Sequence, residues 1–588
     1  MGSTAGLGIF WVANQQLPVF DWHYLFGYAT LLLLALHLAF NWRVVWRFLV
    51  RRAAPDASVG AAPLPRRRRA LALFGTLAAV GAAYWAGWRS GRSQAQAGSD
   101  IATPDADPGA AMAMVERFHA QSSNSRGGVL LRAPGVDWGD APAPFKQYPG
   151  AARIALPNGM PAAGAPFDLA ALATVLWHTA GITAVRAPIR LRASPSSGAL
   201  FATELYVAVR SLPGLPAGVW HYDALGHALE RLEGDAPAAA QIAAAADETA
   251  LQGAAAIVVA TAVFRRSGHK YRDRTYRYLL ADLGHAIENL RVAAIELGAQ
   301  CRFAMRFDEA RCAAALGLDE AEEGVLAWLA LIPRPPAAPV APPAQAAAAA
   351  SAPAPPQRAA AAKSSPLGIT GAMHAATSLA APRVAPQRAA LAPQPAAGAI
   401  TLPPAPSVRA DALRVIATRR SVRRFSGTAL ELDVLSAVLG ALMEPQASLS
   451  QALRVAVVVN AVAGLAPGAY RYDAQRHVLE PRRVGPDLRA AARAAALDQD
   501  VIGDAQAVFV LGVDREALQA DPAGALRGYR HALLQAGCIG ELIYLAAGAR
   551  GLAACAVGAF YDAEAAALVG ADPAREWVLH LVALGVPA

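Results

Sequence analysis

Two short segments of this sequence carry residue types that could bind an anion and a flat ring. In the first, "ATRRSVRRF" (417–425), Arg419, Ser421 and Arg423 recur at every second position. In an extended segment such residues project to the same side. Two guanidinium groups and a hydroxyl suit a phosphate dianion. On the motif alone an arginine-rich solvated loop is the favoured interpretation, and a phosphate site is the alternative.

The second segment is a turn of small residues directly before the strand-like run 204–210. It consists of Pro195, Ser196, Ser197 and Gly198. Small residues let a backbone approach a flat ligand, and their N–H groups can donate hydrogen bonds to it. An ordinary turn before a strand is the alternative. A similar block at 443–461 keeps the strand but has Pro-Gln-Ala-Ser at 445–448.

These segments lie in two copies of one domain. "GLPAGVWHYDALGHALE" (214–230) matches "GLAPGAYRYDAQRHVLE" (464–480), and 276–298 matches 529–551 at nearly the same offset. Such constant offsets indicate a duplicated domain. Between the copies, a Pro/Ala-rich stretch reads as a linker because it cannot bury a core. We expect a first domain at 105–335, a linker at 336–404 and a second domain at 405–588.

Each copy follows the same coarse order of elements. A helical run precedes a strand, a Gly-Tyr-Asp hairpin, a further strand, a long amphipathic helix and a last strand. This mixture predicts an α+β domain with a central sheet. The strands are strongly apolar, so we expect both faces of the sheet to be covered.

The front of the chain, residues 1–98, reads as a membrane anchor. Two apolar runs, 24–42 and 70–88, are each long enough to span a bilayer as a helix. The loop between them is rich in arginine, which places it in the cytoplasm by the positive-inside rule. We therefore expect a multi-pass inner-membrane protein whose soluble domains lie on the non-cytoplasmic side.

Two histidines, one just before the first apolar run and one within it, could be metal ligands. His23 and His37 are 14 residues apart and so lie on one side of a helix. The spacing resembles that of membrane b-type cytochromes and implies haem b, although a second copy or another subunit would have to complete the ligation. A vestigial anchor with His23 at the water interface is the alternative.

Composition excludes some other classes. The 588 residues carry a net charge of +9, and part of the arginine flanks the apolar runs, which favours a membrane over nucleic acid. Zinc-finger spacings and basic helices with interleaved aromatics are absent from the sequence. The four cysteines show no CxxC spacing, and we expect buried small residues rather than disulfides.

The two copies resemble the nitroreductase superfamily of FMN-dependent oxidoreductases, and more narrowly its SagB-type branch, the thiazole/oxazole-forming dehydrogenases. The resemblance rests on "PFKQYPGAARIALP", on 191–223 and 269–290, and on "ATRRSVRRF" and "GAFYD". It implies a dimer with flavin at the interface. One subunit's Arg-x-Ser-x-(Lys/Arg) motif grips the FMN phosphate, and the other's Pro-Ser-Ser lines the ring. Each copy here retains only one motif, so we expect an internal pseudo-dimer with a single FMN site.

The resemblance also implies three further site residues. Gly558, in "VGAF", would let the backbone pass close to the isoalloxazine. Lys270 and Tyr271 match a Lys-Tyr pair associated with catalysis in the azole-forming relatives. A lysine beside a tyrosine could lower the phenol pKa and make it a usable base. A surface lysine with a packing tyrosine is the alternative.

The sequence thus predicts a membrane-anchored FMN oxidoreductase that transfers hydride through flavin N5. The substrate would be a peptide azoline in the branch, or a nitro or quinone compound in the superfamily. The electron partner would be NAD(P)H, a quinone or a haem. The alternative, motivated by motif loss in both copies, is a non-catalytic flavin-binding or scaffold membrane protein.

Overall fold

The computed structural model describes the sequence in segments that cover most of both repeats. They are Trp42, 108–131, Val136, 138–162, 164–232, 235–334, 367–379, 398–404, 411–443, 449–485 and 487–588. All of them except Trp42 belong to one compact unit, Ala86–Ala588.

Each repeat is built on an antiparallel sheet of seven strands, and the two sheets have the same strand order. The first runs β1 (Arg153–Ala155), β6 (Ala228–Arg231), β5 (Gly218–Asp223), β4 (Thr203–Val209), β7 (Ala256–Val263), β9 (Glu323–Pro333) and β8 (Ala299–Phe303). The second runs β10 (Ile400–Thr401), β13 (Val478–Val484), β12 (Gly468–Asp473), β11 (Leu453–Val459), β14 (Ala507–Asp514), β16 (Glu576–Gly585) and β15 (Ala553–Val557). A separate hairpin joins β2 (Ile182–Arg186) and β3 (Ile189–Arg192).

The helices complete two α+β domains in tandem, as the sequence predicts. The first repeat has α5 (Pro108–Ser122), α6 (Arg126–Leu131), α7 (Leu169–Ala180), η3 (Ser197–Ala199), α8 (Asp235–Ala243), α9 (Glu248–Leu251), α10 (Phe264–Tyr271), η4 (Arg272–Arg274), α11 (Thr275–Glu296) and α12 (Glu309–Leu316). The second has α13 (Gly368–Thr377), α14 (Ala412–Thr418), α15 (Leu432–Gly440), α16 (Arg489–Ala495), α17 (Asp500–Gly503), α18 (Arg515–Gln519), α19 (Ala525–Gly548) and α20 (Asp562–Leu568).

One face of each sheet packs on a core that the repeats share, and the other face packs on a core of its own. Successive residues of a strand point to opposite faces, so Leu329 and Val582 enter the shared core. Their neighbours Trp328 and Leu581 enter the two outer cores. Every residue of β7 is buried, which confirms that both faces are covered.

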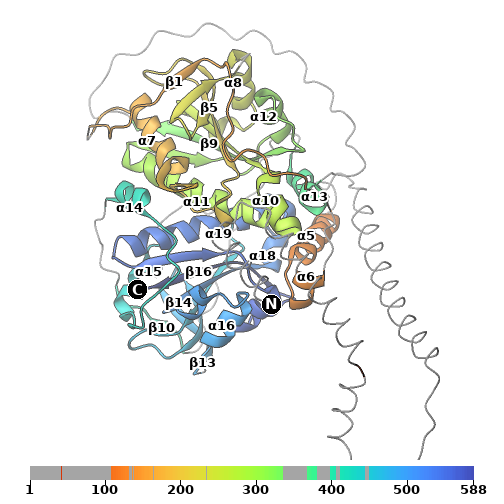
Figure 1. Cartoon of the computed structure of the whole chain (residues 1–588), viewed down its shortest axis with the longest axis vertical. Helices are drawn as coiled ribbons and strands as arrows, with labels where there is room; N and C mark the ends of the chain where they lie inside the picture. Colours follow the sequence, from red (N-terminus) through yellow and green to blue (C-terminus); the bar gives the residue numbers. More distant parts are fainter. Residues whose placement is uncertain are drawn as a thin grey trace, which may run out of the picture. The chain divides into compact units, whose positions relative to one another are not determined.

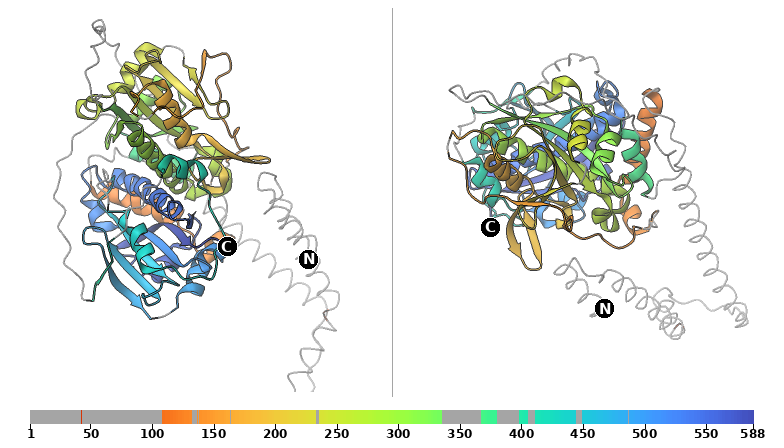
Figure 2. Two further views of the ribbon diagram at one scale, coloured as in Figure 1. Left: turned by 90° about the vertical axis from the view of Figure 1, so that its left-hand side faces the viewer. Right: turned by 90° about the horizontal axis from the view of Figure 1, so that it is seen from above.

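The two repeats meet where the long helices α11 and α19 cross between the sheets (Figures 1 and 2). Gly284 and Gly537 face each other at the crossing, and a Cβ on either would overlap a backbone carbonyl oxygen of the facing helix. Glycine is required there by the close approach of the two backbones. Because these glycines are equivalent in the repeat, the crossing marks the axis that relates the two domains.

Ion pairs on either side of this axis tie the repeats together. Arg274 and Arg277, at the start of α11, each place a guanidinium nitrogen 2.7 Å from the Asp562 carboxylate of the second repeat. The equivalent residues of α19, Arg527 and Arg530, contact Glu309 of the first repeat. All of these side chains are buried. Each long helix is therefore clamped to the start of a short helix in the other domain.

The expected linker, 336–404, contains a helix that its composition did not reveal. Residues Ile369 and Met373 of α13 are buried in the shared core. The Arg274 guanidinium donates to the Ser122 carbonyl oxygen at the end of α5, and Arg527 donates in the same way to Thr377 at the end of α13. The helix α13 is thus the second repeat's counterpart of α5, and "FHAQSS" (118–123) matches "MHAATS" (373–378).

The second repeat also has a helix without a counterpart in the described part of the first. Strand β1 is followed by α7 after the short segment 156–168, whereas β10 is followed by α15 only after 402–431. The longer connection holds α14 and the arginine motif. The first repeat therefore has no segment at this place that could carry such a motif.

The expected membrane segment lies outside the described residues, apart from Trp42. The same holds for His23 and His37. In the part of the chain that the structure describes, no helix combines the length and the apolar character needed to cross a bilayer.

Candidate functional site

The arginine motif leaves α14 as an extended strand beside β15. Ser421 pairs with Ala554 as an isolated parallel bridge, and its hydroxyl lies 2.8 Å from the Tyr544 hydroxyl. The Arg419 guanidinium lies over the Tyr544 ring, 5.1 Å from its centroid, and 3.5 Å from the Ser421 hydroxyl. Arg423 is exposed. The side chains of Arg419 and Ser421 thus share one side, as the alternation predicts.

Arg419 also joins this motif to the small-residue turn of the other repeat. Its Nε donates a hydrogen bond of 3.0 Å to the carbonyl oxygen of Ala193, two residues before Pro195. Arg419 is largely buried, so the bond is shielded from water. The structure therefore brings the two predicted half-sites together, one from each repeat.

A carboxylate that the sequence did not indicate as part of the site binds this turn. Asp282 of α11 accepts hydrogen bonds from the Ser196 hydroxyl, the Ser197 hydroxyl and the Ser197 backbone N–H, each 2.8 Å long. The carboxylate is only partly exposed. Burial raises its pKa to about 6 even though the three bonds act in the opposite direction.

Gly198 follows the two serines in a left-handed conformation, with φ of +64°. A Cβ at this position would lie 2.5 Å from the Tyr271 hydroxyl and 2.9 Å from the Lys270 Nζ. Both the backbone angle and the space therefore require glycine. The close contact also places the predicted Lys-Tyr pair directly against the turn.

The electrostatics of this pair differ from the expectation that Lys270 makes Tyr271 a base. Burial, followed by Tyr278 and Asp282, raises the pKa of the Tyr271 phenol well above its usual value. Tyr271 also stacks on Tyr278, with ring centroids 4.2 Å apart. Burial and the charge of Arg423 lower the pKa of Lys270. Tyr271 is therefore a neutral hydrogen-bond donor rather than a base.

Gly558 lies at the same boundary, but the structure gives a different reason for glycine. The space that a Cβ would need is filled by the Tyr278 ring. The carbonyl oxygen of Gly558 accepts a bond of 3.1 Å from Arg274 Nε. Close contact between the repeats is what this glycine serves in the structure.

Comparison with known proteins now identifies the fold. The model of the nitroreductase family matches residues 165–331 and 416–586, one stretch in each repeat. The chain belongs to the nitroreductase family. This is a family of FMN-dependent oxidoreductases, and the chain carries its domain twice.

Individual curated relatives match shorter stretches of the chain. A candidate nitroreductase of Methanocaldococcus jannaschii, MJ1384, is 29% identical over 133 residues, which are 23% of this chain and 66% of that protein. The trifolitoxin-processing protein TfxB of Rhizobium leguminosarum bv. trifolii is 34% identical over 121 residues, 18% of this chain and 30% of that protein. The matches thus span slightly under two thirds of one curated relative and under a third of the other.

A solved structure matches both repeats together. The crystal structure of a candidate nitroreductase from Anabaena variabilis covers 81% of this chain and 99% of its own length, with a TM-score of 0.66 and 24% identity. At this identity the similarity supports the fold.

The nitroreductase repeats differ at the turn. In the second repeat, the Leu449 N–H donates to Gln535 Oε1 at 2.7 Å, as the Ser197 N–H does to Asp282 in the first. Leu449 thus occupies the place of Ser197, two positions later than the constant offset predicts. Residues 444–448, with Pro445 to Ser448, lie outside the described residues.

Next to Arg419 lies a buried pair, Glu541 and His285, that the sequence did not indicate as part of the site. The Glu541 carboxyl is 3.9 Å from Arg419 Nε and 2.8 Å from His285 Nδ1. Burial raises the pKa of Glu541 to about 8 and lowers the pKa of His285 to about 3. His285 is therefore a neutral core side chain.

The expectation about the cysteines is confirmed, and Glu204 pairs with Arg266 and with His221. All four cysteines are free thiols, three of them buried. Within the described residues, His, Cys, Asp and Glu form no cluster that could hold a metal ion.

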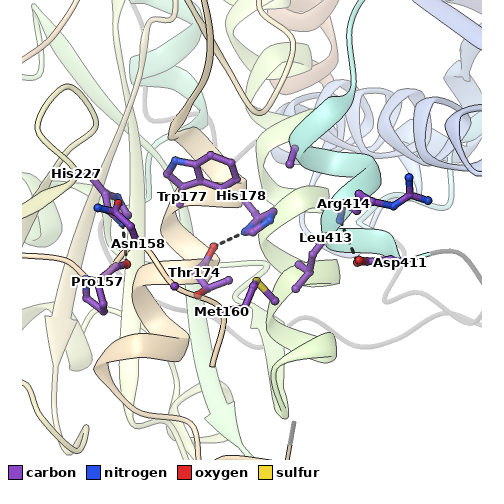
Figure 3. A pocket seen from close by; sticks show the side chains of 12 residues that line it. Pro157, Asn158, Met160, Thr174, Trp177, His178, His227, Asp411, Leu413 and Arg414 are labelled. Carbon is purple, nitrogen blue, oxygen red and sulfur yellow. Dashed lines mark hydrogen bonds between the residues drawn. The ribbon is translucent and has the colours of Figure 1, made fainter. Parts of the chain in front are cut away.

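A pocket of about 420 Å³ lies between α7 and α14 (Figure 3). Trp177 and His178 of α7 line it together with Leu413 and Arg414 of α14. The His178 Nδ1–H donates to the Thr174 carbonyl oxygen at 2.7 Å. The predicted site residues are not among those that line this pocket, which separates it from the turn and the arginine motif.

Proposed function

We propose that this nitroreductase-family chain is an FMN-dependent oxidoreductase with one complete flavin site between its repeats. The observation that carries the proposal is the hydrogen bond from Arg419 Nε to the Ala193 carbonyl oxygen. It joins the arginine motif of the second repeat to the turn of the first, and the family resemblance implies that one FMN needs both. The described part of the first repeat has no room for its own arginine motif.

The residues present fit the phosphate and the flat ring of FMN. Arg423 and Lys270 come from different repeats, yet the charge of Arg423 contributes to the lowered pKa of Lys270. An anion between these cations would relieve their repulsion. Gly198 keeps the turn free of a bulky side chain, so a ring can approach its backbone.

Each part of the site then has a role. FMN, when bound, supplies two-electron chemistry through its N5. Arg419, Ser421 and Arg423 would hold the phosphate, and Pro195 to Gly198 would line the ring. Tyr271 keeps its proton at neutral pH and can donate a hydrogen bond, while Lys270 can exchange a proton more readily than an exposed lysine.

For the substrate, we propose the SagB-type reaction, the oxidation of a peptide azoline to an azole. Support comes from the Lys-Tyr pair against the turn and from the similarity to a protein named for trifolitoxin processing. Reduction of nitro or quinone compounds, which fits the wider superfamily, is the competing reaction class.

We also propose that the enzyme is anchored in the inner membrane with its repeats on the non-cytoplasmic side. The two apolar runs and the arginine-rich loop between them support this placement. Nicotinamide is scarce outside the cytoplasm, so a quinone or a haem held by His23 and His37 is the proposed electron partner.

The second candidate is a non-catalytic flavin-binding or scaffold protein. It is favoured by the incomplete second site, where Leu449 replaces a motif serine and Gln535 replaces the carboxylate. Complementary retention of the two motifs at the other site favours the enzyme.

Flavin content tests the proposal. We expect the full-length chain, purified in detergent, to contain one FMN per polypeptide by absorbance after release. A Soret band would add haem to the electron path. Two flavins per chain would contradict the single site, and no flavin after reconstitution would favour the scaffold.

Replacing Gly198 with alanine should weaken FMN binding because the new Cβ would displace Tyr271 and Lys270. The left-handed backbone adds a strain of about 1–2 kcal/mol. Gly551→Ala is the matched control, since Gly551 has a φ of +70° but no atom within 4 Å of its Cβ position. Both variants should lower the thermal midpoint, and only Gly198→Ala should raise the FMN dissociation constant. Equal FMN affinities would contradict this prediction.

A further inference from the structure

Among the described residues, Asp282 is the carboxylate that binds the predicted flavin-lining turn. It accepts bonds from two hydroxyls and one backbone N–H of that turn. An ionised carboxylate can only accept, so both serine hydroxyl hydrogens must point toward it. The Ser196 oxygen already accepts the Phe201 N–H at 3.0 Å. The Ser197 oxygen is therefore the one that can accept an N–H of a ligand.

The second repeat provides a natural comparison. At the equivalent place, Gln535 accepts the bond from the Leu449 N–H at 2.7 Å, so a neutral amide is enough to bind this backbone N–H. The carboxylate is found in the repeat whose turn keeps both serines and the glycine. The negative charge of Asp282 is therefore not required for the bond to the backbone N–H, and the carboxylate accepts the two serine hydroxyls as well.

We propose that Asp282 is a positioning residue that holds the turn at Ser196 and orients the Ser197 hydroxyl toward FMN, and that its negative charge lowers the reduction potential of the bound flavin. The inference rests on the proposed flavin site. A buried negative charge disfavours the addition of electrons nearby, because the surrounding protein screens it less than water would.

The protonation state of Asp282 makes this effect depend on pH. Burial places its pKa at about 6, so the carboxylate is ionised at pH 8 and protonated at pH 5. The ionisable groups around it are Tyr271, whose pKa it raises, and the neighbours of Tyr271, namely Tyr278 and Arg423. Lys270 lies against the same turn. The tyrosines remain neutral between pH 5 and 8.

The test compares wild type with Asp282→Asn, which keeps an acceptor but removes the charge. We expect Asp282→Asn to bind FMN and, at pH 8, to shift the two-electron reduction equilibrium about tenfold toward reduced flavin, or about 30 mV. At pH 5 the two proteins should have the same midpoint potential. The difference in midpoint potential between the two proteins does not contain the pH dependence of the flavin itself, because that dependence is common to both.

Two further variants separate positioning from charge. Ser197→Ala keeps the carboxylate, so the equilibrium constant for two-electron reduction of its flavin should stay within threefold of the wild-type value. Asp282→Ala removes the acceptor as well and should weaken FMN binding to the flavin-free protein at least tenfold. If Asp282→Asn does not fold, the test uses Ser197→Ala, which keeps the charge. Different flavin midpoint potentials of wild type and Ser197→Ala at pH 8 would then overturn the proposed effect of the charge.

The outcomes distinguish this inference from the proposed function. Absence of FMN from wild type would defeat the proposed function itself. FMN in both wild type and Asp282→Asn with equal potentials at pH 8 would overturn the role of the charge and leave the flavin site standing. Loss of FMN from a folded Asp282→Asn would overturn the inference that the charge is needed for the potential but not for FMN binding.

Discussion

Replacing Arg419 and Arg423 together with alanine should weaken FMN binding by about 10²–10⁴-fold, since a hydrogen bond to a charged group contributes about 1.5–3 kcal/mol. Both guanidinium groups would be lost from the phosphate site, whereas the turn that lines the ring would remain. The measurement is a titration of the flavin-free protein with FMN, followed by flavin fluorescence.

Arg424→Ala provides the matched control for that variant. Arg424 is an exposed arginine of the same segment, but the alternation of the strand places it on the other side from Arg423. Its FMN affinity should stay close to that of wild type. Equal losses in the control and in the double variant would point to a general effect of positive charge, contrary to a specific phosphate site.

Replacing Asp562 with asparagine should destabilise the protein by about 3–5 kcal/mol, because Arg274 and Arg277 would be left buried without a counter-charge. Since the two arginines and the carboxylate come from different repeats, the loss reports on their association. The measurement is urea unfolding at pH 7, followed by tryptophan fluorescence.

The effect of Asp562 should depend on pH with a definite sign. Burial alone would raise its pKa, but Arg277 and Arg274 outweigh burial and lower the pKa to about 2. The stabilisation is therefore complete above the unfolded pKa of about 3.9 and is lost as the pH falls toward 2. The difference in unfolding free energy between wild type and variant should shrink over that range.

Asp500→Asn is the control for the buried ion pairs of Asp562 with Arg274 and Arg277. Asp500 pairs with Arg493 at 2.8 Å, but both side chains are more than half exposed, and such pairs contribute at most about 1 kcal/mol. If Asp562→Asn loses no more unfolding free energy than Asp500→Asn, the buried ion pairs of Asp562 do not hold the repeats together.

Much of the candidate site could be predicted because it depends on short local patterns. The alternation of Arg419, Ser421 and Arg423 is a property of an extended chain, and the turn at 195–198 follows from its small residues. The offset of the repeats was equally visible because whole motifs recur. These features could be read without knowing which distant segments meet.

Other features could not be predicted because they depend on contacts between distant segments. Composition suggested a linker where α13 lies, since the few apolar residues of that helix become significant only when they reach the shared core. Tyr271 was expected to be a base, but its pKa depends on burial against Tyr278. Asp282 was missed because a lone acidic residue in a helix gives no sign of the turn it will face.

The sequence by itself thus determined the duplicated α+β fold, the nitroreductase resemblance and the two half-motifs, all of which are encoded in residues near each other along the chain. The tertiary structure decided that the half-motifs meet through Arg419 and Ala193. It also decided that α14 has no counterpart in the described part of the first repeat. The meeting of the half-motifs follows from the crossing of α11 and α19 at Gly284 and Gly537, where the close approach of two backbones sets which segments of the repeats face each other.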